Sequence, residues 1–285
     1  MLWLLGKGAA GLALAQEPTP LFKAEVRLVE VYATVFDQKG KYLDGLTQER
    51  FEILDNGERQ AVSVFESHTA DLSCAILFDT TGSMTEALPV VKNAIVKLID
   101  QLRADDWVAV YTFSTSLQML QDFTRNKQAA KRAVLRTRAE GMTALFDAIT
   151  QVAAAVSRRN GKKAIVVFTD GHDTASVLGA SAAATRARKL GVPFYGVAQG
   201  EALKSATLVR QLKEIAQMTG GRAYTVRKAR EVEAVFQDIS TDLQHTYLLA
   251  YRAPHTKDPR WRSIQMAVKD LKDYRLRARE GYFPE

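Results

Sequence analysis

The residues best suited to chemistry are Asp79, Thr81 and Ser83, where a carboxylate and two hydroxyls alternate along the chain. They follow an apolar run at residues 74–78 that is typical of a buried strand. Carboxylate and hydroxyl oxygens are hard ligands of the kind that Mg²⁺ prefers, in octahedral geometry and with several waters retained. The pattern by itself is ambiguous, because an aspartate before small polar residues also ends strands and caps helices.

Two later segments carry oxygen donors of the same kind. Thr143 lies just ahead of a predicted helix, and Asp170 follows a second apolar run at residues 164–168. Open α/β sheets bind ligands at the carboxyl ends of their strands, in the crevice where the strand order reverses. If the strands that end at Asp79 and Asp170 are neighbours there, the two carboxylates converge. The predicted ligands of Mg²⁺ or Mn²⁺ are Asp79, Thr81, Ser83, Thr143 and Asp170.

Three side chains close to these ligands in sequence are interpreted as structural. Asp173 is expected to cap the next helix rather than support the site. Asp147, in the helix after Thr143, is interpreted as structural, and His172 as an exposed loop histidine because no nucleophile pairs with it.

The elements that must position these residues alternate between strand and helix from Leu72 to about Leu243. Apolar runs predict buried strands at residues 74–78, 108–113, 164–168, 193–198 and, more weakly, 222–226. Apolar residues at helical spacing predict amphipathic helices at residues 88–102, 208–215 and 232–243. Near-continuous apolar strands separated by amphipathic helices predict a doubly wound, mostly parallel α/β sheet that is covered on both faces.

The two ends of the chain have strand periodicity. Residues 22–70 contain β-branched runs around tight turns at 37–40 and 55–57, and residues 245–285 contain strand patterns at 247–251, 262–268 and 274–279. We expect both ends to join in one small all-β sandwich, with an α/β domain at residues 71–244 inserted between its halves. Two independent appendages are the alternative. The alternating Arg275, Arg277 and Arg279 would share one face of a strand, interpreted as solvated.

The pattern Asp-x-Thr-x-Ser at 79–83, with the later Thr143 and Thr-Asp-Gly at 169–171, resembles the metal-ion-dependent adhesion site of von Willebrand factor A domains. The usual first element is Asp-x-Ser-x-Ser, and Thr81 departs from it while keeping the oxygen. The resemblance implies that Ser83 and Thr143 bind the ion directly and that the aspartates act partly through water. It also implies that the open position of the ion accepts a carboxylate from a ligand.

The similarity extends over nearly the whole chain after residue 20. Residues 29–35, 45–54, 220–223 and 279–283 look like the bacterial VWFA-related domain family. Members of that family are typically predicted to be exported, and their biological roles are mostly unassigned. The resemblance implies architecture more directly than purpose.

The resulting hypothesis is a non-enzymatic, metal-dependent binding module for adhesion or assembly, whose partner protein offers an Asp or Glu carboxylate. One alternative is a metal-assisted phosphohydrolase with Asp79 as nucleophile, although phosphatases of the haloacid dehalogenase type have a second aspartate where this chain has Thr81. The other alternative is a structural surface protein that binds through its β-sandwich.

Composition and charge narrow the cellular context. The net charge is +7, but the basic residues are scattered, which argues against a specific nucleic-acid partner. No apolar stretch reaches the roughly 20 residues of a membrane-spanning helix, and the sequence indicates no oligomeric state. Residues 1–15 are apolar and end in Ala13-Leu14-Ala15, which predicts a signal peptide and export to the periplasm, cell surface or medium, although Lys7 interrupts the stretch. An N-terminus that is not a signal would leave the protein cytoplasmic.

Overall fold

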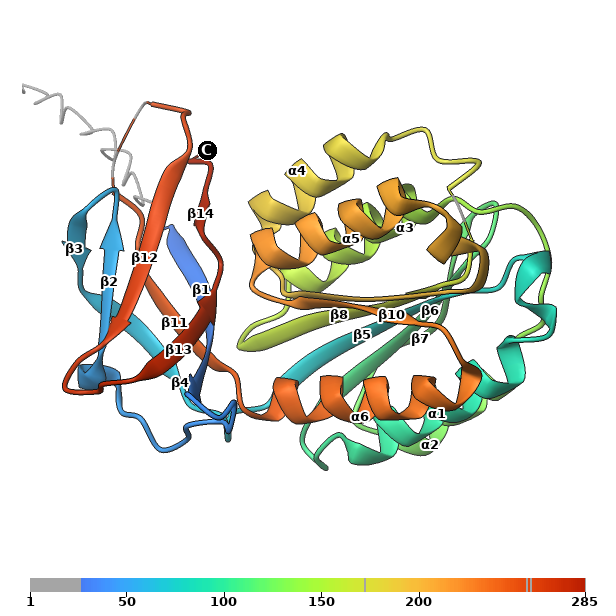
Figure 1. The fold of residues 1–285 in the computed structure, drawn as a ribbon, viewed down its shortest axis with the longest axis horizontal. Helices are drawn as coiled ribbons and strands as arrows, with labels where there is room; N and C mark the ends of the chain where they lie inside the picture. The colour runs from blue at the N-terminus through green and yellow to red at the C-terminus, as the bar shows by residue number, and fades with distance from the viewer. Residues whose placement is uncertain (1–26, 172, 255, 257, 285) are drawn as a thin grey trace, which may run out of the picture.

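The computed structural model describes residues 27–284, apart from residues 172, 255 and 257 (Figure 1). The predicted signal peptide at residues 1–15 and His172 therefore lie outside the described residues. None of the described helices is both long and apolar enough to cross a membrane.

The centre of the molecule is a six-stranded sheet in the order β10-β9-β8-β5-β6-β7. Its parallel strands are β5 (Leu72–Asp79), β6 (Trp107–Phe113), β8 (Lys162–Thr169), β9 (Phe194–Gln199) and β10 (Arg222–Val226). Every residue of β5 and β8 is buried, as expected for strands covered on both faces. The sequence analysis missed β7 (Leu117–Thr124), which pairs antiparallel with β6 at the sheet edge. Its residues are mostly half-exposed or exposed, so it lacks the continuous apolar run of a central strand.

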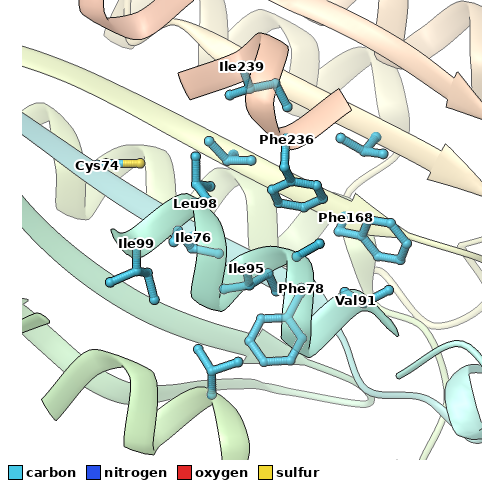
Figure 2. Close-up of a cluster of buried hydrophobic side chains, with 14 of the residues drawn as sticks. Cys74, Ile76, Phe78, Val91, Ile95, Leu98, Ile99, Phe168, Phe236 and Ile239 are labelled. Atoms are coloured by element: carbon cyan, nitrogen blue, oxygen red, sulfur yellow. The ribbon is translucent and has the colours of Figure 1, made fainter. Parts of the chain in front are cut away.

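Three helices cover each face of this sheet (Figure 1). One face carries α1 (Leu88–Gln101), α2 (Lys127–Leu135) and α6 (Ala229–Gln244), and the other α3 (Leu145–Ser157), α4 (Ala180–Leu190) and α5 (Ala206–Thr219). Figure 2 shows the core between the sheet and the first of these helix layers, in which Ile95 of α1 and Phe236 of α6 pack over Phe78 and Phe168 of the sheet. The predicted fold class is confirmed.

Strands from the two ends of the chain form two four-stranded antiparallel sheets. One has the order β13-β1-β11-β4, made of Tyr274–Ala278, Leu28–Asp37, Tyr247–Arg252 and Val62–Glu66. The other has the order β14-β12-β2-β3, made of Gly281–Tyr282, Arg262–Val268, Phe51–Asp55 and Glu58–Gln60. Alternate residues of these strands point inward and share one core, so the expected all-β sandwich of N- and C-terminal strands is confirmed.

A buried carboxylate stabilises this sandwich. Asp55, at the end of β2, is fully buried and accepts hydrogen bonds from the hydroxyls of Tyr251 at 2.9 Å and Tyr282 at 2.8 Å. It also forms an ion pair with Arg262, whose Nε lies 2.6 Å away. Four strands from both ends of the chain, β2, β11, β12 and β14, therefore meet at one charge.

A second buried carboxylate connects the sandwich to the α/β domain. Asp242, near the end of α6, is fully buried and accepts hydrogen bonds from the hydroxyls of Tyr195 at 2.6 Å and Tyr42 at 3.1 Å. Arg277 of β13 donates to the same carboxylate. Burial and the neighbouring charge of Asp242 raise the pKa of Tyr195 well above its usual value, so this hydroxyl stays a donor.

The interpretation of the arginine row as a solvated face is therefore wrong for two of its members. Arg275 is exposed, but Arg277 binds Asp242, and Arg279 is only 4% exposed. Arg279 donates to the backbone oxygens of Glu30 and Arg188. At Arg277 and Arg279 the face that the arginines share is covered by the α/β domain, and sequence periodicity cannot show such a cover.

Candidate metal centre

The predicted site lies where β5 and β8 end side by side. These strands pair in parallel with Phe78 opposite Phe168, so that Asp79 and Asp170 leave the sheet at the same edge. From β5 the chain crosses to β6 on one side, whereas from β8 it crosses to β9 on the other. This is a topological switch point, where the crevice of an open α/β sheet forms. The expected neighbourhood of the two strand ends is confirmed.

The first element is a tight loop closed by its own aspartate. One carboxylate oxygen of Asp79 accepts the backbone N–H of Thr81 at 2.9 Å, and a 3₁₀ helix begins at Gly82. The hydroxyls of Thr81 and Ser83 lie 2.9 Å apart, so both point to the same side of the loop. The hydroxyl of Ser83 then donates to Asp170 at 2.9 Å. Two strand ends that are far apart in sequence are thereby joined by side chains.

Thr143 reaches this group from a third segment. The backbone N–H of Glu140 donates to the oxygen of Thr80 at 2.6 Å, which lays the chain before Thr143 across the first loop. A side-chain carbon placed on Gly171 would stand 3.4 Å from the hydroxyl oxygen of Thr143 and 3.8 Å from that of Ser83. The two hydroxyls thus face one common space, which the missing side chain of Gly171 leaves open.

The electrostatics of the crevice favour a cation. Burial raises the pKa of Asp79 to about 6, although hydrogen bonds from Thr81 oppose the shift, and the charge of Asp170 adds to it. Burial also raises the pKa of Asp170. Two desolvated carboxylates beside each other are costly when both are ionised, and a bound divalent cation would offset that cost.

The donor set fits a hard cation rather than zinc. The five predicted ligands supply two carboxylates and three hydroxyls, the oxygen chemistry that suits Mg²⁺ or Mn²⁺. No three His, Cys, Asp or Glu side chains of the described residues are grouped so that they could hold a metal ion. The structure brings Asp79, Thr81, Ser83 and Asp170 into one hydrogen-bonded chain with Thr143 facing it, and ion binding by them remains a prediction.

Sequence reasoning missed the role of Thr169. This last residue of β8 is fully buried, and its hydroxyl donates at 3.0 Å to the second carboxylate oxygen of Asp79. Both oxygens of Asp79 are therefore oriented by protein donors. This contact could have been predicted from the position of Thr169 directly before Asp170. If the strand that Thr169 ends lies beside β5, its last residue comes close to the Asp79 side chain.

Asp173 and Asp147 are structural, as interpreted, but Asp173 caps a different helix from the expected one. Its carboxylate accepts the backbone N–H of Phe146 at 3.0 Å, in the first turn of α3, which precedes it in the chain. Asp147 accepts the backbone N–H groups of Val177 and Leu178 at 2.8 and 2.9 Å. The two carboxylates fix the loop after β8 against the start of α3.

Comparison with known sequences relates this chain to a recognised domain family. A model of the von Willebrand factor type A domain matches residues 74–238, more than half of the 285 residues. The human voltage-dependent calcium channel subunit alpha-2/delta-2 is 32% identical over 111 residues, which are 34% of this chain and 10% of that protein. The mouse subunit matches equally well, over 9% of its length. The chain thus spans about a tenth of these relatives.

Comparison with solved structures shows the same fold. A von Willebrand factor type A protein from Catenulispora acidiphila superposes with a TM-score of 0.54 and 15% identity, covering 90% of this chain and 73% of that one. The vWF domain of the type V pili tip protein Mfa5 from Porphyromonas gingivalis superposes with a TM-score of 0.52 and 11% identity, covering 61% of this chain and 95% of that one. At these identities the likeness concerns the fold.

Proposed function

The chain belongs to the von Willebrand factor type A domain family, and from this premise we propose that it is a magnesium-dependent protein-binding module for adhesion or assembly. The observation that carries the proposal is the common space that the hydroxyls of Ser83 and Thr143 share beside Gly171, with Asp170 bonded to Ser83. Oxygens from three separated segments face one position, as a small hard cation requires.

Some of these side chains would bind the ion, and others would orient its ligands. We propose that Ser83 and Thr143 bind the ion directly, while Asp79 and Asp170 bind partly through water and balance its charge. When bound, Mg²⁺ (or Mn²⁺) would supply a concentrated positive charge that an Asp or Glu of a partner protein completes. Thr169 keeps Asp79 in place through its hydrogen bond.

An enzymatic role has less support from the geometry. A phosphohydrolase would need Asp79 as an open nucleophile, but this side chain is fully buried, and its two oxygens accept hydrogen bonds from Thr81 and Thr169. The position of the expected second aspartate is occupied by Thr81. We therefore propose a non-enzymatic role, and turnover of a phosphate ester that is lost in Asp79→Asn would contradict it.

Export is part of the proposal. The small-x-small pattern at residues 13–15 supports a signal peptide, and an extracytoplasmic location suits a domain that binds other proteins by adhesion. Binding through the β-sandwich alone is the competing arrangement. Partner capture that persists undiminished in a chelator would favour the sandwich over the crevice.

The central test is calorimetric titration of the whole chain with MgCl₂ and MnCl₂. We expect Asp79→Ala to lower the affinity for the ion about 100-fold, because it removes both a charge and a loop-closing hydrogen-bond acceptor. Asp100→Ala, which removes an exposed carboxylate of α1, is the matched control and should leave the affinity unchanged. Undiminished affinity in Asp79→Ala would refute the site, whereas an anomalous manganese peak between Ser83 and Thr143 in a crystal would locate it.

A second variant tests the orienting role of Thr169. Thr169→Val keeps the shape of the side chain but removes the donor to Asp79, so we expect about a 10-fold weaker ion affinity with the fold retained. The control is Thr225→Val, at an exposed threonine in the edge strand β10 of the same sheet. Equal ion affinities in the two variants would show that the hydrogen bond has no role in the site.

A further inference from the structure

The exposed apolar side chains of this protein are unevenly distributed. Six large apolar residues of the described chain are exposed, namely Leu28, Val90, Met119, Leu135, Met142 and Val177. Single exposed residues of this kind need no explanation, whereas a group of them marks a binding surface. Four of the six, Val90, Leu135, Met142 and Val177, lie at the crevice end of the α/β domain, in the segments that follow β5 and β8 and in those that frame Thr143.

Met142 and Val177 lie on the two loops that carry Thr143 and Asp170. Met142 precedes Thr143 and is 57% exposed, and Val177, in the loop after Asp170, is 92% exposed. The backbone oxygen of Thr143 accepts the N–H groups of Thr174 and Ala175 at 2.9 and 3.0 Å, which joins the two loops. Both apolar side chains therefore stand on one rim.

The backbone beneath these side chains is held in place. The N–H of Met142 donates to the hydroxyl of Thr115 at 3.1 Å, and Gly141 before it has a φ of +87°, a conformation that suits glycine. The N–H of Val177 donates to Asp147 at 2.8 Å. A fixed backbone that presents an uncovered apolar side chain is typical of a surface that is pre-organised for contact.

Two arginines beside the crevice offer positive charge to an acidic ligand, next to the exposed Glu140 of the same segment and to Glu201, whose charge acts on Asp170. Arg136 and Arg138 are exposed on the segment that leads from α2 to Thr143. Within the part of the chain that the structure describes, neither has a carboxylate within 4.0 Å. The sandwich contacts the opposite end of the sheet, where Glu30 pairs with Lys163 at the start of β8, so it leaves this face uncovered (Figure 1).

We propose that this rim, made by Met142 and Val177, binds a partner-protein segment in which a large apolar residue stands next to the acidic residue that reaches the crevice. The inference rests on the proposed function of the metal site and adds the class of ligand that the site selects. The acidic side chain completes the ion, the apolar neighbour covers Met142 and Val177, and the two arginines attract further negative charge on the partner.

The test compares two synthetic peptides, Gly-Leu-Glu-Leu-Gly and Gly-Ser-Glu-Ser-Gly, both capped and fluorescently labelled. In MgCl₂ we expect the leucine peptide to bind the whole chain about 10-fold more tightly, because burial of apolar surface adds to the same carboxylate contact. In the Met142→Ser/Val177→Ser double variant this preference should disappear, while calorimetry gives an unchanged Mg²⁺ affinity.

Leu28→Ser is the matched control, since Leu28 is 41% exposed but lies at the start of β1, in the sandwich and far from the rim. It should keep the full preference for the leucine peptide. The rim proposal is overturned if both peptides bind the wild type equally, or if the double variant still prefers the leucine peptide. The proposed function would still stand in either case, provided that binding depends on Mg²⁺. If neither peptide binds in MgCl₂, both proposals fall together.

Discussion

The Asp242→Ala variant should unfold with a free energy about 3–5 kcal/mol lower than that of the wild type. The substitution leaves the guanidinium of Arg277 without its carboxylate and removes the acceptor of two tyrosine hydroxyls, those of Tyr195 and Tyr42. A buried charge without a partner and unpaired buried donors are among the most destabilising changes in a folded protein. Urea unfolding followed by circular dichroism measures the difference.

Two further variants separate this effect from the loss of any acid on α6. Asp238→Ala removes a carboxylate of the same helix that is 44% exposed, pairs with Arg222 at 3.1 Å and accepts the hydroxyl of Tyr224 at 3.0 Å, so it should cost about 1–2 kcal/mol. Adding Arg277→Met to Asp242→Ala removes the unpaired charge and should restore part of the stability. The explanation fails if Asp242→Ala costs no more than Asp238→Ala.

The Asp55→Ala variant should lose a similar amount, about 3–5 kcal/mol, but within the sandwich. It leaves the half-buried Arg262 without its ion pair and the hydroxyls of Tyr251 and Tyr282 without their acceptor. Burial, together with Asp55, raises the pKa of Tyr282 to about 12, so its hydroxyl stays protonated and needs Asp55 as its acceptor. Thermal unfolding should show the loss, and calorimetry should show an unchanged Mg²⁺ affinity because the crevice is at the far end of the α/β domain.

The matched control for this variant lies on the same strand. Glu52 of β2 pairs with Arg59, whose side chain is 66% exposed, so Glu52→Ala should change the stability by less than about 1 kcal/mol. If the Asp55 and Glu52 variants unfold alike, the hydrogen-bonded carboxylate is not what holds the four strands together.

The buried contacts between the sandwich and the α/β domain also explain how the molecule can present its crevice. Asp242 and Arg279 attach the sandwich at the end of the α/β domain where the parallel strands begin. The carboxyl ends of the strands, and the predicted ligands with them, face away from this attachment (Figure 1). The sandwich therefore serves as a base, and the opposite face stays open for a partner.

Much of the α/β domain could be predicted from local patterns. The strands that end at Asp79 and Asp170 are buried on both faces, and such strands read as continuous apolar runs. Three elements were not predicted. Strand β7 is a half-exposed edge strand. Helices α2 and α4 each bury only two residues, Ala130 and Val134 in α2 and Ala183 and Ala187 in α4, so none of the three shows a strong apolar period.

The candidate site, too, could be predicted only in part from the sequence. The types and spacing of Asp79, Thr81 and Ser83 follow from a few consecutive residues, and so could be read directly. The donor from Thr169 to Asp79 and the open space beside Gly171 depend on the distance between two neighbouring strand ends. The order of residues along the chain does not give the distance between these strand ends.

The sequence by itself determined most of the strands and helices and which residues offer oxygen ligands, because side-chain periodicity and residue type are local properties. Only the tertiary structure decided that Arg277 and Arg279 are covered, that Asp173 caps a helix preceding it in the chain, and that Met142 and Val177 share one rim. Each of these facts is a contact between segments far apart in the chain, and its energy depends on what the fold places opposite a side chain.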